Sequence, residues 1–280
     1  MRVGGRINPA LAPWIILSNF FQKIYLQHDL IRNLVVRDLR ARYIGSFMGF
    51  FWSVINPVVL IASYSFVFMV VLNIGAPEDS GTRYFPLFLF CNILPWLFFQ
   101  DTLQRSSTVI IDNANLITKT LFPTEILPLT ILLSGLINHL IGCAILLFIM
   151  IVVGHPISIF ALFVPIYLLF LMFFTLGLAW FVSSLNVFIR DISQVLGVIL
   201  TFWFWFTPIF YTGIKIPKQY SFIARLNPLA HVVTGYRDCL LRMKMPDLQA
   251  LAWFAVASVV VFVAGGLFFR HIKREFVDVL

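Results

Sequence analysis

Six apolar segments, each about as long as a bilayer is thick, constrain the fold of this chain more than any other feature. A helix needs about 20 apolar residues to cross the hydrocarbon core of a membrane. Inside that core every backbone polar group must be hydrogen-bonded within the protein, so each segment is predicted to be a helix. The first carries Asn56-Pro57, where a kink is expected. The segments are 47–74, 84–103, 129–153, 157–182, 195–211 and 248–269.

The composition leaves little room for a soluble domain. Apolar residues make up 60% of the chain and charged residues 11%, whereas an ordinary soluble domain is about 25% charged. The net charge of +8 comes from Lys and Arg that lie beside the apolar segments, where they can meet anionic lipid headgroups. Membrane lipids, and not nucleic acid, are therefore the expected partners of these charges. The sequence predicts an all-α integral membrane protein with six transmembrane helices.

An amphipathic helix is predicted before the first apolar segment, within 19–43. Its apolar residues recur at intervals of three, four or seven, and charged residues fill most of the remainder. This pattern is typical of a helix that lies in the membrane surface. A helix packed on a soluble partner is the alternative. The apolar positions are Phe20, Ile24, Ile31, Leu34, Val35 and Leu39.

The distribution of basic residues predicts the orientation in the membrane. With six spans both termini lie on one side, and thirteen Lys and Arg residues fall on that side against seven on the other. Because basic residues favour the cytoplasmic side, both termini are predicted to be cytoplasmic. The expected organisation is a cytoplasmic N-terminal part with the interfacial helix (1–46), a six-span transmembrane domain (47–270) and a cytoplasmic tail (271–280).

The connection 212–247 opposes this topology, because it holds six of the seven basic residues on the outer side. Within it, Pro228–Leu241 is moderately apolar but too short to span a bilayer. We therefore predict a helical hairpin that re-enters the membrane from the outer face between spans five and six. Irregular backbone at that depth survives only where protein or water covers it, which favours a place beside a pathway.

The sequence lacks the common catalytic motifs. It has no GxxxxGK[ST] phosphate loop and no HExxH, and its three cysteines fit neither a disulfide framework nor a zinc site. Asp101 and Arg105 are expected to form an interfacial ion pair, and His139 a hydrogen bond between helices. We predict neither catalytic nor metal-binding residues.

Two further features point to partners or cargo. The predicted cytoplasmic loops 113–128 and 186–194 contain more apolar residues than solvated loops usually do, which favours docking onto a partner. Aromatic residues crowd the end of the fifth segment, from Trp203 to Tyr211. They are typical of an aromatic belt at the membrane interface. Consecutive aromatics project all around a helix, however, so some face inward, where their rings can serve as platforms for sugars.

Four stretches in order and spacing resemble one family, the type-2 ABC transporter permeases that export O-antigen, capsular polysaccharide and teichoic acid. Each stretch alone is a weak signal, but together they cover about residues 35 to 240. They are RDLRARY at 37–43 with the following Gly45-Ser46, Gly49, Trp52 and Asn56-Pro57; KTLFPTEILP at 119–128; FIRDI at 188–192; and Asn227-Pro228-Leu229 with Gly235-Tyr236-Arg237-Asp238.

The resemblance implies an assembly and a cargo. Two copies of the chain would form a channel above two copies of a separate ATPase, which would bind ATP and Mg, so that this chain carries no cofactor. The cargo would be a glycan on an undecaprenyl diphosphate lipid, moved across the bacterial cytoplasmic (inner) membrane. The chain itself would not be an enzyme.

The resemblance and the placement of charges also suggest roles for individual residues. ATPase coupling would fall to Leu121, Phe122, Pro123, Thr124, Glu125, Arg190 and Asp191; headgroup or lipid-diphosphate contact to Arg37, Arg40 and Arg42; the channel to Trp52, Phe202, Trp203, Phe206 and Tyr211; and the outer gate to Asn227, Pro228, Tyr236 and Arg237.

Two other functions remain open from the sequence. A drug- or small-lipid-exporting permease of the same superfamily is disfavoured by the aromatic tract and the basic helix before the first span. A membrane-embedded transferase acting on lipid-linked sugars would need acidic or His residues at the membrane face. Its candidates are Asp101, Asp112, His139 and Asp191, none of which is paired with another by sequence spacing.

Overall fold

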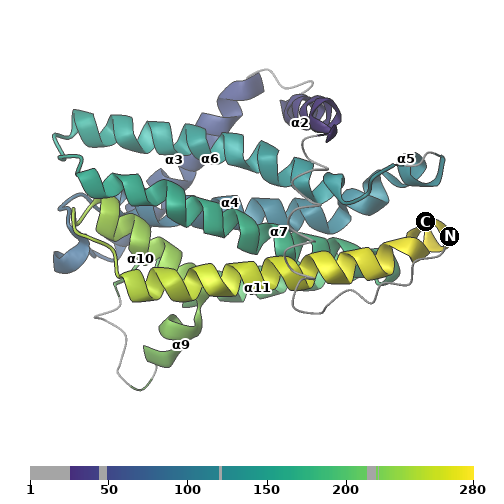
Figure 1. Ribbon diagram of the computed structural model, residues 1–280. Coiled ribbons are helices and arrows are strands. Elements are labelled where there is room, and N and C mark those ends of the chain that lie inside the picture. Colours follow the sequence, from purple (N-terminus) through teal and green to yellow (C-terminus); the bar gives the residue numbers. More distant parts are fainter. Residues whose placement is uncertain (1–25, 44–48, 120–121, 213–218, 220) are drawn as a thin grey trace.

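The computed structural model describes residues 26–43, 49–119, 122–212, 219 and 221–280, and their regular structure is entirely helical. Four long helices run side by side through the molecule (Figure 1). They are α4 (Phe85–Asp112), α6 (Ile126–Val152), α7 (Val164–Phe188) and α11 (Leu248–Ile272). The remaining main helices are α2 (His28–Tyr43), α3 (Trp52–Ser65), α5 (Ala114–Lys119), α8 (Ile192–Phe206), α9 (Ser221–Leu226) and α10 (Pro228–Leu240).

Within the described residues, five helical stretches are long and apolar enough to cross a membrane, and α8 is shorter. These five overlap the first, second, third, fourth and sixth predicted segments, and α8 overlaps the fifth. The prediction of an all-helical fold with six apolar helices is confirmed. The five are Trp52–Val71, Phe85–Asp112, Ile126–Val152, Ile159–Phe188 and Leu248–Glu275. The first is α3 continued by a π-helical turn, Phe66–Val71, and the fourth is α7 preceded by the 3₁₀ helix Ile159–Phe163.

Two of the helix ends that differ from the prediction have an identifiable cause. The fifth helix ends at Phe206 and not at residue 211, because Pro208 restricts the residue before it to extended backbone. Thr207 accordingly has φ −91° and ψ 131°. The second helix runs nine residues beyond the predicted end at Leu103. Polar residues such as Ser106 and Ser107 in this extension are fully buried by neighbouring helices, which a scan for apolar residues does not detect.

The closest helix packing joins α7 to α11. A Cβ atom on Gly265 would lie 2.0 Å from the backbone oxygen of Gly177, and one on Gly177 would lie 2.4 Å from the oxygen of Val261. Only glycine permits such an approach, as at many helix crossings in membrane proteins. The two helices therefore form a tightly joined pair.

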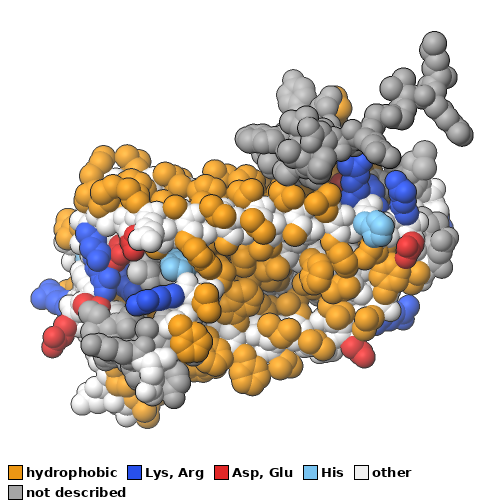
Figure 2. All heavy atoms as spheres, turned by 60° about the horizontal axis from the view of Figure 1, so that its bottom comes forward, with side chains coloured by type: hydrophobic (Ala, Val, Ile, Leu, Met, Phe, Trp, Pro, Cys, Tyr) orange, Lys and Arg blue, Asp and Glu red, His pale blue; other side chains and the backbone are white. Residues whose placement is uncertain are grey.

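Charged residues gather at the two ends of the bundle. Figure 2 shows hydrophobic side chains over the middle of the visible face, with acidic and basic side chains towards both ends. One end, which we name the α5 end, holds α5, the start of α6 and the C-terminal end of α11; Lys273 pairs there with Glu125 at 3.0 Å. The other, the α10 end, holds α9 and α10, and His155 after α6 shares a hydrogen bond with the carbonyl of Gly81 before α4 at 3.1 Å.

Helix α2 lies across the bundle near the α5 end (Figure 1). Its apolar face packs on α6 through Ile31, Leu34 and Val35, which are all buried. Three of the six predicted apolar positions are thereby confirmed as a buried face, and Leu39 is partly buried against the same core. Phe20 and Ile24 lie outside the described residues.

Candidate functional site

A cluster of four charged residues joins α2 to the bundle at the α5 end. We name Asp38, Arg42, Asp101 and Arg105 the charge quartet. Asp38 pairs with Arg105 and, at 3.5 Å, with Arg42. Asp101 pairs with Arg42 at 3.0 Å and with Arg105 at 3.9 Å. The two acids and two bases thus alternate, and each charge faces two of the opposite sign.

Ser134 of α6 lies at the centre of the quartet. Its hydroxyl donates to Asp38 at 2.5 Å and lies 3.3 and 3.4 Å from the guanidinium groups of Arg42 and Arg105. One cluster therefore ties three helices together: α2, α4 and α6. The predicted pair of Asp101 and Arg105 is present, but the sequence did not show that α2 completes it.

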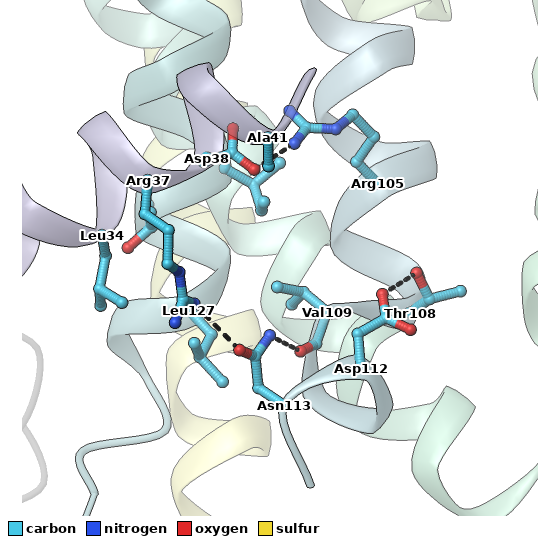
Figure 3. Close-up of a pocket in the computed structure, with 12 residues that line it drawn as sticks. Leu34, Arg37, Asp38, Ala41, Arg105, Thr108, Val109, Asp112, Asn113 and Leu127 are labelled. Atoms are coloured by element: carbon cyan, nitrogen blue, oxygen red, sulfur yellow. Dashed lines mark hydrogen bonds and ion pairs between the residues drawn. The ribbon is translucent and has the colours of Figure 1, made fainter. Parts of the chain in front are cut away.

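A cavity of about 280 Å³ opens beside the quartet, between the same three helices. In Figure 3 Asp38 and Arg105 at its edge point toward each other and are joined by a dashed line, and Arg37 reaches down to Asn113. Arg37 donates to the Asn113 side chain at 3.1 Å. Both signs of charge line the cavity, since Asp112 also faces it.

The predicted headgroup residues thus occupy different surroundings. Arg40 is exposed on α2, and Arg37 is exposed but bonded to Asn113. The guanidinium of Arg42 faces the two acids of the quartet, and its side chain is only 17% exposed. The prediction of headgroup contact is therefore better supported for Arg40 than for Arg42.

A groove of about 540 Å³ runs between α3, α4 and α8. Helix α4 contributes exposed Gln100 and Gln104 one turn apart, and α8 contributes exposed Thr201. Four aromatic and three aliphatic side chains also line it, together with Asp101 and Arg105 of the quartet. Polar and charged groups beside aromatic rings in a membrane protein are typical of a binding surface for a polar molecule with apolar faces. The aromatic residues are Tyr64, Trp96, Phe204 and Trp205.

The predicted channel aromatics lie outside this groove, three of them on α8, one after α8 and one at the start of α3. Trp203 points into the bundle, where its ring lies 5.2 Å from that of Phe99. Phe202 and Phe206 are exposed on α8, at 64% and 50%, and Tyr211 donates its hydroxyl proton to the carbonyl of Trp205 at 3.2 Å. Trp52 lines a separate cavity with α4 and α6. None of these five lines the groove, whereas their neighbours Phe204 and Trp205 do.

The predicted coupling residues lie at the α5 end. Arg190 and Asp191 are exposed in the turn between α7 and α8. Segment 122–125 is held more firmly: Thr124 is buried, and Trp180 donates to the carbonyl of Glu125 at 3.1 Å. The Glu125 carboxylate faces Lys273. Leu121 lies outside the described residues.

Asn227 directly precedes α10, and Pro228 is the first residue of that helix. Both the oxygen and the nitrogen of the Asn227 side-chain amide are hydrogen-bonded. Its oxygen accepts from the backbone N–H of Leu229 at 3.0 Å and from the indole of Trp203 at 2.8 Å. Its nitrogen donates to the hydroxyl of Thr207 at 3.0 Å and to the carbonyl of Phe206 at 3.3 Å. Asn227 is thus both the N-cap of α10 and the joint between α10 and the end of α8.

The remaining predicted gate residues are buried in the middle of α10. Tyr236 and Arg237 are 0% and 1% exposed. Gly235 before them packs against the Tyr167 ring, which a Cβ would approach to 2.2 Å.

An ion cluster at the α10 end secures the end of α10. Arg242 pairs with Asp79 at 2.5 Å and with Asp238 at 2.8 Å, and Lys244 lies 3.6 Å from Asp238. The connection 212–247 carries six basic residues that oppose the predicted topology. Three of them are Arg237, Arg242 and Lys244. They are balanced within the protein or buried in it.

Comparison with known proteins agrees with the motifs. The family model described as ABC-2 type transporter matches residues 29–241. The O-antigen export system permease protein RfbA of Myxococcus xanthus is 30% identical over 259 residues, which cover 92% of this chain and 97% of that protein.

More distant relatives carry similar names. An O-antigen export system permease protein RfbA of Klebsiella pneumoniae is 27% identical over 90% of this chain and 95% of its own. The polysialic acid transport protein KpsM of Escherichia coli is 23% identical over 88% and 94%. The resemblance inferred from the four motifs is thereby confirmed, and the chain belongs to the ABC-2 type transporter family of multi-pass membrane proteins.

Proposed function

We propose that this chain is the membrane subunit of an ATP-driven transporter that exports a lipid-linked polysaccharide. The groove between α3, α4 and α8 carries the proposal. Its aromatic rings offer flat apolar surfaces to the C–H faces of sugars, while Gln100, Gln104 and Thr201 offer hydrogen-bond partners to hydroxyl groups. The names of the relatives, O-antigen permeases and a polysialic acid transporter, support the same class of cargo.

The groove also supports a homodimer. Polar groups that face lipid are costly, because lipid offers no hydrogen bonds. The helices beside the groove expose broad apolar faces: Val70, after α3, is 67% exposed and Val198 of α8 is 59% exposed. A second copy that packs on these faces covers the polar groove and turns it into a channel.

Cross-linking tests the homodimer. With the three native cysteines replaced by alanine, cysteines at Val59, Phe66 or Val70 should give bis-maleimide-linked dimers in membranes. Val256 of α11, which is 66% exposed, is the matched control and should not cross-link. Equal cross-linking from α11 would contradict a dimer across the groove.

The α5 end is assigned to the ATPase. Two separate ATPase subunits, which bind ATP and Mg, dock on the exposed turn with Arg190 and Asp191 and on segment 121–125. Helix α2 rests at the headgroups through Arg37 and Arg40, and its pairing with α4 and α6 through the quartet carries ATPase motion into the bundle. The quartet also argues against a transferase, because Asp101, one of its candidate acids, faces two arginines.

With the ATPase at the α5 end, the proposed membrane orientation agrees with the one that the distribution of basic residues favours. The α5 end lies in the cytoplasm with both termini, α8 is the sixth span, and α9 and α10 re-enter the outer half of the bacterial inner membrane. The parts are then the cytoplasmic N-terminus 1–46, the permease 47–270 and the tail 271–280. The α10 end, with Asn227, Pro228, Tyr236 and Arg237, is the outer gate.

Reconstitution tests the function directly. The purified chain and its ATPase in lipid vesicles should associate and hydrolyse ATP faster when undecaprenyl diphosphate-linked glycan is added. The free glycan and the lipid without glycan are the controls. If the two proteins associate but a hydrophobic drug stimulates hydrolysis and the glycan does not, the cargo is a drug or small lipid and the proposal is wrong.

A further inference from the structure

Helix α6 carries two polar contacts that lead to different parts of the molecule. Ser134 touches the quartet and through it α2. His139, five residues later and about 7.5 Å farther along the helix axis, reaches Tyr236 of α10. The helix begins at Ile126, directly after the segment assigned to ATPase coupling. One helix thus touches the ATPase side, the interfacial helix and the outer gate.

The hydrogen bond between His139 and Tyr236 joins two buried side chains. The His139 Nε2 atom shares a hydrogen bond of 3.1 Å with the Tyr236 hydroxyl, and the rings meet edge to face with centroids 6.0 Å apart. His139 is 3% and Tyr236 0% exposed. The Phe98 ring, with its centroid 5.4 Å from that of His139, covers the imidazole. Such a buried pair is costly to separate, because each group would lose its hydrogen-bond partner.

This hydrogen bond is a specific link between α6 and α10. Helix α10 packs mainly on α4, α7 and α11, whereas α6 packs mainly on α4, α2 and α7. Among the described residues, no other side-chain hydrogen bond joins α6 to α10. A displacement of α6 along its axis therefore reaches α10 directly at this point.

Space beside His139 permits such a displacement. A cavity of about 200 Å³ lies between α3, α4 and α6 and is lined by His139, its neighbour Asn138, and Gly142. It extends to Arg42 and Asp101 of the quartet. Close-packed interiors resist movement, but here one face of α6 borders open volume from the quartet to the histidine.

We infer that the His139–Tyr236 hydrogen bond is the positioning contact through which α6 moves the outer gate helix α10 when the ATPase acts. The inference rests on the proposed function, since it assigns the gate and the ATPase to the two ends. A purely structural bond would hold α10 in place without affecting how many ATP molecules each exported glycan requires.

The test removes one oxygen atom. Tyr236→Phe should lower the glycan exported per ATP hydrolysed at least tenfold in proteoliposomes. Tyr167→Phe is the matched control: Tyr167 is also buried and also contacts α10, at Gly235, but its hydroxyl makes no hydrogen bond among the described residues. It should leave the ratio within twofold of the wild type.

Variants of the histidine complete the cycle. His139→Phe should lower the ratio as much as Tyr236→Phe, the double variant should be no worse than either, and His139→Gln, which can bond the hydroxyl, should restore at least half of it. Equal losses in Tyr236→Phe and Tyr167→Phe, or additive losses in the double variant, would overturn the inference.

A measurement without glycan separates the inference from the proposed function. Hydrogen exchange of the α10 amides should change when the ATPase is trapped with nucleotide and vanadate, and Tyr236→Phe should abolish that change. If wild-type protein exports no glycan, the proposed function is lost, and this exchange experiment still decides the inference. An unaltered exchange response in Tyr236→Phe would refute it.

Discussion

Helices α3 and α4 are neighbours that differ in how much of their surface is buried. Both belong to stretches long and apolar enough to cross a membrane. In the 18-residue apolar part of each stretch, 78% of the residues are buried in α4 but only 11% in the stretch that contains α3. The more apolar of the two is the less buried. Helix α4 instead buries polar residues such as Asn92, Thr102 and Ser106 completely.

The difference separates a packed body from its edge. Helices α4, α6, α7, α10 and α11 hold one another through glycine contacts and buried hydrogen bonds. Helices α3 and α8 rest on that body by one side and leave an apolar side uncovered. In a membrane, apolar surface can face lipid or another subunit without cost, so exposed apolar helices mark an outer boundary or an interface. Substitutions should therefore act on stability in the body and on transport at the edge.

The largest effect is expected at the tightest contact of the body. Gly265→Ala places a Cβ atom 2.0 Å from the Gly177 oxygen, so α7 and α11 must separate. We expect a loss of at least about 2–3 kcal/mol, seen as a fall in Tm of roughly 5–10 °C by fluorescence-detected size exclusion. Gly75→Ala, with open space at its Cβ, is the control. Equal behaviour of the two variants would break the distinction between body and edge.

The attachment of α2 should depend on the quartet. Asp38→Asn leaves Arg42 and Arg105 with only Asp101 to balance them. Because these side chains are partly exposed, we expect a loss of about 1–3 kcal/mol, between the values for surface and buried pairs. Thermal unfolding measures it, and faster tryptic cleavage within α2 locates it. The control is Asp112→Asn, since the Asp112 side chain is exposed. If Asp112→Asn lowered the thermal stability as much as Asp38→Asn, the quartet would not be what attaches α2.

At the edge, a groove substitution should alter transport more than stability. Trp205 is 56% exposed and lines the groove. Trp205→Ala should lower glycan export about three- to tenfold, or roughly 0.7–1.4 kcal/mol, with little change in Tm. Phe148→Ala on α6, at 65% exposure, removes an exposed ring away from the groove and should leave export unchanged. A fall in Tm without a fall in export would show that Trp205 stabilises the packed body and does not act in transport.

The smallest effect is expected at the membrane surface. Exposed Arg40 should contribute about 1 kcal/mol of attraction to anionic headgroups. Arg40→Gln should therefore reduce the extra thermal stability that anionic lipids give over zwitterionic ones in nanodiscs, and salt should mask the difference. Arg40→Lys keeps the charge and should behave as wild type. A lipid response that Arg40→Gln leaves intact would place α2 away from the headgroups.

The sequence predicted what depends on neighbouring residues and missed what depends on distant ones. Length and hydropathy are local, so the six apolar helices were found. Arg42 was assigned to headgroup contact from its place on a basic helix, and the sequence did not show that Asp101, 59 residues away, pairs with it. The direction of each aromatic on α8 depends on what packs against it, so Trp203 was assigned to the channel while Trp205 lines the groove. Tyr64 and Trp96 gave no signal, since single aromatics are common in apolar helices.

The pairing of Asn227 with Pro228 also bears on how long the protein lasts. An asparagine ages when the following backbone nitrogen attacks its side-chain amide and forms a succinimide, which hydrolyses to an acid. Pro228 has no N–H, so this route is closed at the residue whose amide bonds α8 to α10. An acid there would face the Phe206 carbonyl with an oxygen in place of a donor. The joint is thus protected from deamidation by this route through the residue that begins the helix.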